Sequence, residues 1–223
     1  LVSTSVWVMG GFCLATSQGF SVQIAHLVGR GDFRGARSVV RQGLLCVFLF
    51  SLILALLGIV ISGPLPYWLG GGQDINSDAT IYFKTFSVFI PAMQMVYSAG
   101  AMLQASGNMK IPSALEILMC ILDVIFNYIF IFRLDMGVRG AALGTGVAEC
   151  IVALLMMGFL CFRSPELNLL QDRDKRVNGV KQGAGLRPQR TVLKRAWNIS
   201  GPLWFQNVVV KGAYVASTLI VAP

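Results

Sequence analysis

Three polar side chains lie within the long apolar stretch 111–132, and their types and spacing would let them bind a proton or a cation. They are Glu116, Asp123 and Asn127. On an α-helix, spacings of seven and four residues put all three on one face. Asp123 has six uncharged residues before it and nine after it, which puts it near the middle of a membrane span. A carboxylate at that depth costs about 2.5–3.5 kcal/mol on insertion scales, and it usually faces a bundle interior or a wet cavity.

A purely structural role for Asp123 is the alternative interpretation. In that case a protonated Asp123 would hydrogen-bond to Asn127, one turn away, and would serve only helix packing. We favour the functional interpretation, because ionisable groups at this depth of a membrane are functional by default. Glu149 is a second carboxylate, halfway along the apolar stretch 139–162. Asp123, Asn127 and Glu149 are therefore the candidates for cation or proton coupling. The candidates for lining the same cavity are Gln18, Gln23, Gln94, Tyr97 and Glu116.

The elements that position these side chains are six apolar stretches, each long enough to cross a bilayer as a helix. They cover residues 5–28, 39–62, 79–105, 111–132, 139–162 and 196–221. Hydrophobic residues make up 55% of the chain, charged residues 13%, and the mean hydropathy is +0.69. Soluble chains carry about 25% charged residues, and a span needs about 20 apolar residues. The sequence predicts an all-α, polytopic membrane helical bundle with six spans.

The basic residues indicate orientation, because they lie between the apolar stretches. The net charge is +8, and 14 of the 18 Lys and Arg residues fall in the elbow after residue 29, at Lys110 and in the segment 163–195. Six spans put these connections on one side, which the positive-inside rule makes cytoplasmic. We interpret the charge as topology signals and contacts with anionic lipid rather than with nucleic acid. His26, near the elbow, is expected to be a packing or interfacial residue.

Cysteine and histidine usage argues against redox, zinc and enzyme chemistry. All five cysteines lie in apolar stretches without a CxxC pair, so neither a disulfide framework nor a metal site is indicated. A membrane-embedded enzyme would need clustered catalytic groups near an interface. The chain has a single His and no such cluster.

The chain divides into a bundle, a linker and one further helix. Residues 1–162 form the bundle, 163–195 a polar, basic linker, and 196–223 the first helix of a second bundle. Within the fifth stretch, Gly140 and Gly144 form a GxxxG pair, and Ala142 and Gly146 a second small pair, so we expect close helix contact there. Because the sequence starts without Met and ends inside an apolar run, we expect it to be part of a longer protein.

Three stretches together resemble the MATE (multidrug and toxic compound extrusion) family of secondary transporters. GFSVQIAHLVGRGDFRGARSVVRQGL is similar to the second helix, first cytoplasmic elbow and third helix of that family. LQASGNMKIPSALEI is similar to the connection between its fourth and fifth helices. LDVIFNYIFIFRLDMGVRGAALGTGVAE is similar to its fifth and sixth helices. The resemblance implies that the chain holds helices two to seven of twelve, comprising most of the N-lobe of a two-lobe transporter and the start of the C-lobe.

The resemblance also implies site residues. Many bacterial members carry Asn and Asp one turn apart on the fifth helix, where they line the N-lobe cavity. Here Asp123 comes first and Asn127 second, so the order is reversed. Glu149 stands where a Gln is common, which adds an acid to the cavity.

The function implied by the resemblance is secondary active efflux by alternating access. The protein would be a multi-pass antiporter of the inner or plasma membrane, and not an enzyme. It would export organic cations, drugs or metabolites in exchange for H⁺ or Na⁺, with no cofactor other than that ion. Its partners would be a small, cationic substrate, the lipid bilayer and the remaining C-lobe of the same polypeptide. A lipid-linked oligosaccharide flippase of the wider superfamily is the alternative. Such proteins tend to carry more basic residues in their cavity.

Overall fold

The computed structural model of the chain describes residues 2–68, 73–164, 167 and 190–221, and every regular element in these residues is helical. The long helices are α1 (Val2–Gly29), α2 (Phe33–Ile61), α4 (Gln73–Ala105), α5 (Lys110–Tyr128), α6 (Gly137–Gly158) and α7 (Arg190–Val221), and a short α3 (Leu65–Trp68) follows α2. Helices α5 and α6 each continue into a five-residue π-helical turn, η1 (Ile129–Arg133) and η2 (Phe159–Arg163). The predicted all-α class is confirmed.

Four of the described helices are long and apolar enough to cross a membrane. Their apolar segments are Phe33–Ile61, Asn76–Ala105, Lys110–Arg133 and Gly137–Arg163. Helices α1 and α7 are of similar length, at 28 and 32 residues, but their described parts are not among these four. The polytopic membrane bundle is confirmed, and membrane crossing by α1 and α7 stays a prediction.

Two helices begin earlier than the sequence pattern predicts. Helix α4 begins at Gln73 instead of residue 79, and α7 at Arg190 instead of residue 196. The apolar pattern locates the part of a helix inside the bilayer, whereas the polar first turns lie outside it and leave no hydropathy signal. The end of the predicted linker is therefore helical. Residues 168–189 of that linker lie outside the described part of the chain.

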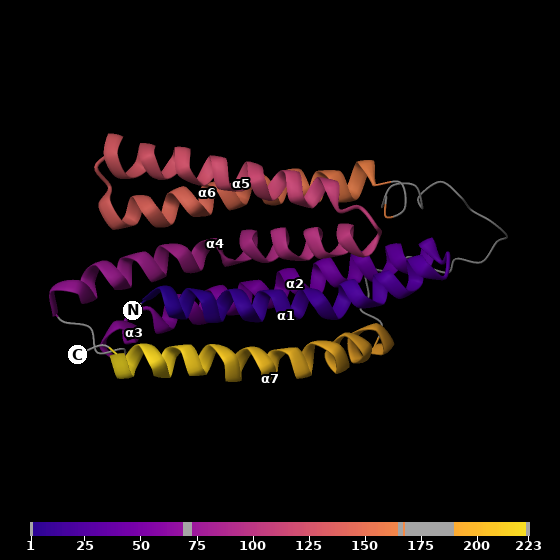
Figure 1. Cartoon of the computed structure of the whole chain (residues 1–223), viewed down its shortest axis with the longest axis horizontal. Coiled ribbons are helices and arrows are strands. Elements are labelled where there is room, and N and C mark those ends of the chain that lie inside the picture. The colour runs from indigo at the N-terminus through magenta and orange to yellow at the C-terminus, as the bar shows by residue number, and fades with distance from the viewer. Residues whose placement is uncertain (1, 69–72, 165–166, 168–189, 222–223) are drawn as a thin grey trace.

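The helices run alternately up and down in a layered bundle (Figure 1). Helix α4 is the central element, because it packs against α1, α2 and α6. Helix α5 packs mainly on α6, and α7 packs on α1. Fully buried core side chains come from four of these helices: Ile24, Val40, Met102, Leu103 and Met156. Figure 1 shows the α1–α2 elbow, the α4–α5 connection and the start of α7 at the same end of the bundle, as the charge pattern predicted.

Local signals explain the tight elbow between α1 and α2. Gly31 has a positive φ of 73°, a backbone conformation that glycine adopts without steric cost. Asp32 then caps α2, since its Oδ1 accepts a hydrogen bond of 2.9 Å from the backbone N–H of Gly35. The elbow thus turns the chain back within a few residues and presents its basic side chains at one end of the bundle.

Small residues let α6 approach two neighbouring helices closely. A Cβ atom on Gly140 would lie 2.8 Å from the carbonyl carbon of Phe130 in η1, and one on Gly144 would lie 2.9 Å from the backbone nitrogen of Asn127 in α5. A Cβ atom on Gly146 would enter the ring of Phe89 in α4. The close contact predicted from the GxxxG pattern is confirmed.

Glycines on α1 likewise allow α7 to approach α1 closely. A Cβ atom on Gly19 would lie 2.7 Å from the carbonyl oxygen of Ala196 and still closer to the hydroxyl of Ser200. One on Gly11 would lie 2.9 Å from Oδ1 of Asn207. Glycines two turns apart on α1 therefore allow α7 to lie directly on it.

Candidate functional site

Asp123 and Asn127 lie one turn apart on α5, and both are half-buried. The Asn127 side chain lies against Gly144 of α6, where the missing Cβ leaves room for it. Within the described part of the chain, Oδ1 of Asp123 and Oδ1 of Asn127 are buried and accept no hydrogen bond. Two oxygen acceptors on one helix face thus remain available to a cation or a proton.

Glu149 adds a second carboxylate from α6. Its side chain is only 7% exposed, and its Oε2 is buried with no hydrogen-bond partner among the described residues. It lies close enough to Asp123 for their charges to interact. Two like charges in a poorly solvated interior repel each other, so a proton or a cation bound between them is stabilised.

A fully buried polar group on α4 extends this region toward α1. Gln94 is 0% exposed, and its Nε2 lies 3.0 Å from Oγ of Ser17, 3.1 Å from Oγ of Ser98 and 3.2 Å from the carbonyl oxygen of Cys13. The hydroxyls of Ser17 and Ser98 are 2.8 Å apart. The Oε1 of Gln94 is buried and accepts no hydrogen bond from the described residues. Cys13 is within electrostatic range of Glu149, so the Gln94 amide and Glu149 lie in the same part of the bundle.

The predicted residues divide into two groups. We call Asp123, Asn127, Glu149, Gln94 and Tyr97 the polar cluster, since Tyr97 also lies within electrostatic range of Glu149. Glu116 is exposed, but its charge reaches Tyr97, which puts it at the edge of this cluster.

The two glutamines of α1 differ in their surroundings, and the role of Gln18 in lining the cavity stays a prediction. Gln18 is half-buried, and its Oε1 accepts a hydrogen bond of 3.3 Å from Ser21 on the same helix. Gln23 is buried and faces α7, where its Nε2 donates to the carbonyl oxygen of Val192 at 3.3 Å. Gln23 therefore lines a cavity, as expected, but one formed by α1, α2 and α7.

Sequence reasoning missed Ser17 and Ser98. Gln94 and Ser98 are four residues apart, and so are Cys13 and Ser17, which puts each pair on one helix face. The contact between these faces of α1 and α4 joins residues far apart in the sequence. No sequence signal predicts it. No group of three metal-binding side chains was found among the described residues.

The MatE family profile matches residues 1–129, which is more than half of the chain. The chain belongs to the MatE family. This MatE chain is 28% identical over 170 residues to a protein of Thermotoga maritima described as "Probable multidrug resistance protein NorM". It is also 23% identical over 157 residues to the "FAD transporter" of Shewanella oneidensis. The matches cover 73% and 69% of the MatE chain, and 36% and 34% of these relatives.

Solved MATE structures share the fold. The MatE chain matches an inward-facing multidrug resistance MATE transporter of the MOP superfamily with a TM-score of 0.82, and an outward-facing structure with 0.81, both at 18% sequence identity. The matches cover 94% and 93% of the MatE chain, but only 45% and 44% of those chains. The MatE chain thus spans about a third of the length of these curated relatives and less than half of these solved transporters.

Proposed function

We propose that the whole protein is a secondary active efflux antiporter, which exports organic cations in exchange for H⁺ or Na⁺ by alternating access. The observation that carries this proposal is the polar cluster, in which Asp123 and Asn127 of α5 lie beside Glu149 of α6 with buried, unpartnered oxygens. Intramembrane carboxylates in such a position mark ion and substrate pathways.

Competition for the same negative charge would produce the exchange. With no ion bound, the two carboxylates repel each other and attract a cationic substrate. A proton or Na⁺ neutralises one of them, which weakens the binding of the substrate and stabilises the cluster without it. If the ion and the substrate prefer opposite orientations of the lobes, the ion gradient drives export.

Similarity to both orientations supports rocking of a rigid lobe. The TM-scores against inward-facing and outward-facing structures are nearly equal, at 0.82 and 0.81. A lobe that resembles both states equally well need not refold between them, which fits alternating access by rigid-body motion. The partner in this motion would be the remaining C-lobe of the same polypeptide, in a multi-pass protein of the inner or plasma membrane with no enzymatic activity.

The charge of the cluster favours a cationic substrate. The polar cluster and its edge contain Asp123, Glu149 and Glu116, and no basic side chain is among these residues. The relative from Shewanella oneidensis is described as an FAD transporter. The carboxylates of the cluster would repel an anionic substrate such as FAD unless basic groups outside the described residues compensated for them. A lipid-linked oligosaccharide carries phosphate and meets the same repulsion, so the flippase is the less favoured proposal.

The proposal is tested by transport in proteoliposomes that contain the full-length protein. We expect uptake of a fluorescent organic cation to follow an imposed H⁺ or Na⁺ gradient. Asp123→Asn preserves side-chain volume and hydrogen bonding, so the protein should fold while coupled transport falls steeply. Adding Asn127→Asp returns one carboxylate to the same helix face and should recover part of the activity.

Two outcomes would contradict this assignment. A transport rate that depends on neither the H⁺ nor the Na⁺ gradient would exclude secondary active transport. Normal coupled transport by Asp123→Asn would make Asp123 a packing residue, and Glu149→Gln would then be the variant that has to abolish coupling.

A further inference from the structure

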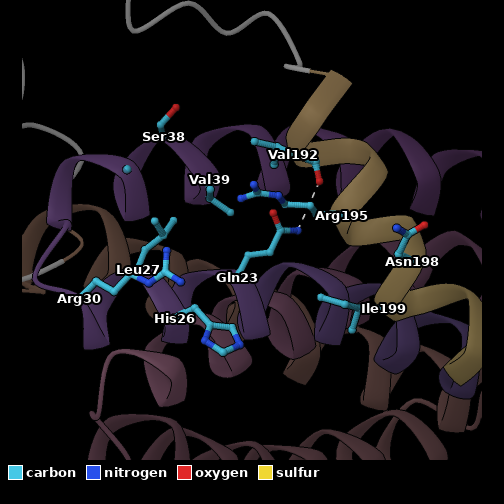
Figure 2. Close-up of a pocket in the computed structure, with 11 residues that line it drawn as sticks. Gln23, His26, Leu27, Arg30, Ser38, Val39, Val192, Arg195, Asn198 and Ile199 are labelled. Carbon is cyan, nitrogen blue, oxygen red and sulfur yellow. Dashed lines mark hydrogen bonds between the residues drawn. The ribbon is translucent and has the colours of Figure 1, made fainter.

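The cavity that Gln23 lines has a volume of about 790 Å³ and lies where the end of α1, the start of α2 and the start of α7 meet (Figure 2). It is separate from the polar cluster, and none of the five cluster residues lines it. The side chains around it come from all three helices and the elbow: Gln23, His26 and Leu27 of α1, Arg30 of the elbow, Ser38 and Val39 of α2, and Val192, Arg195, Asn198 and Ile199 of α7.

The charge of this cavity is positive. Arg30 and Arg195 are 165 residues apart in the sequence, yet both line it, and none of its lining residues is acidic. Within the described part of the chain, neither of these arginines forms an ion pair. Figure 2 shows Gln23 and His26 along α1 and Arg30 in the elbow, with Arg195 reaching out from α7. Both arginines are exposed, and because no lining residue is acidic, an anion in the cavity is attracted by both guanidinium groups.

Neutral donors complete the site. Ser38 supplies a hydroxyl and Asn198 a side-chain amide, and both line the cavity. The Gln23 amide is only 8% exposed and is already used, since it donates to the carbonyl oxygen of Val192 at 3.3 Å and to that of Gly19 at 3.0 Å. Gln23 therefore fixes α7 against α1 at the floor of the cavity, and the arginines and neutral donors remain for a ligand.

The position of the cavity indicates that the ligand comes from the membrane. Arg30 follows the last residue of α1, and Arg195 lies in the second turn of α7, so both are at helix ends on the basic side of the bundle. Phe33 of α2, near this cavity in the sequence, is exposed by 37%. Leu193 and Trp197 of α7, exposed by 42% and 64%, line a neighbouring apolar pocket together with Phe20 and Phe50. Tryptophan at the boundary between lipid and water is typical of membrane interfaces. A soluble anion gains nothing from an apolar pocket next to the basic cavity, whereas the glycerol and upper acyl chains of a lipid bound in the cavity do.

We infer that this cavity binds the phosphodiester headgroup of an anionic phospholipid from the cytoplasmic leaflet. The planar guanidinium groups of Arg30 and Arg195 match phosphate oxygens in pairs. Basic pockets between membrane helices on the cytoplasmic side are known sites for such headgroups. A cavity of about 790 Å³ has the size of a small-molecule site, roughly 300–1,000 Å³. The bound lipid would connect α7, the expected first helix of the C-lobe, to the α1–α2 elbow of the N-lobe.

Binding of short-chain lipids to the full-length protein in a neutral detergent tests this inference. Dioctanoyl phosphatidylglycerol is titrated and followed by microscale thermophoresis, with dioctanoyl phosphatidylcholine and inorganic phosphate as separate arms. We expect saturable binding of phosphatidylglycerol, at least about tenfold weaker binding of phosphatidylcholine, and weak competition by phosphate. Arg30→Gln and Arg195→Gln should each weaken phosphatidylglycerol binding about tenfold, the effect of losing one charge-assisted contact.

Arg34→Gln is the matched control, because Arg34 is an exposed arginine of the same elbow that does not line the cavity. It should leave the binding constant unchanged. Arg195→Lys keeps the positive charge but loses the two parallel hydrogen bonds of the guanidinium group. Its dissociation constant for phosphatidylglycerol should lie between those of the unchanged protein and Arg195→Gln, and this variant tests the site even if Arg195→Gln does not fold. If Arg34→Gln weakened phosphatidylglycerol binding equally, the effect would come from general surface charge, and the proposed site would be refuted. Phosphate binding as tight as that of phosphatidylglycerol would overturn the lipid assignment and leave a site for a soluble anion.

Discussion

Replacing Gly144 with alanine tests whether the contact between α5 and α6 positions the polar cluster. The new Cβ would lie 2.9 Å from the backbone nitrogen of Asn127 and closer still to its Oδ1. Ordinary van der Waals contact begins at 3.4 Å, so the helices must separate by about 0.5 Å, or the Asn127 side chain must leave its place.

The magnitude follows from two opposing effects. Overpacking of this kind costs about 1–3 kcal/mol, whereas glycine to alanine in an unobstructed helix gains roughly 0.5–1 kcal/mol. Gly158→Ala isolates the second effect, because Gly158 lies on the same helix and its Cβ would meet no atom within 4 Å. Because the glycine-to-alanine gain is common to both variants, the free energy of unfolding should differ between them by the overpacking cost, about 1–3 kcal/mol.

The assay is unfolding of the full-length protein in mixed detergent micelles, followed by far-UV circular dichroism, with gradient-driven transport measured in parallel. Gly144→Ala should be the less stable variant and should also lose coupled transport, because it displaces Asn127 from the cluster. Gly158→Ala should keep both properties. Equal stability and equal transport in the two variants would refute the close contact.

Two further predictions concern orientation and capping. In a cysteine-free background, Gly31→Cys should not react with an impermeant thiol reagent added outside the cell, whereas Gln73→Cys, at the opposite end of the bundle, should react. The reverse labelling would refute the orientation that places the elbow in the cytoplasm. Asp32→Ala removes the hydrogen bond to Gly35 and should lower the free energy of unfolding by about 1 kcal/mol, measured in the same micelles; Asp32→Asn, which can still cap, should retain most of it.

The sequence predicted well what depends on local pattern. Apolar stretches located the long helices, and the four-residue spacing of Asp123 and Asn127 put them on one face. Glu149 was grouped with them because it is a second carboxylate halfway along an apolar stretch. The GxxxG pattern predicted close helix contact in that stretch, without naming the partner helix.

The parts that could not be predicted depend on contacts between distant segments. Gln94 meets Ser17 only because α1 packs against α4, and nothing in either sequence specifies that pairing. Gln18 and Gln23 were assigned to one cavity because both are polar residues in an apolar helix. Only the position of α7 shows that Gln23 faces elsewhere. The elbow was interpreted as a topology signal alone, since Arg195 lies far from Arg30 in the sequence.

The glycine face of α6 has a mechanical consequence. Helix α5 contributes one buried residue, Pro112, and it meets α6 closely at Gly144, against which the Asn127 side chain lies. A shift of α5 by one residue along its axis is 1.5 Å, and it would change the separation of Asp123 on α5 and Glu149 on α6. Because Coulomb energy depends on that separation, the occupancy of the cluster and the axial position of α5 are thermodynamically linked. Binding of a cation or proton to the cluster therefore shifts the axial position of α5, and a shift of α5 changes the affinity of the cluster by the same free energy.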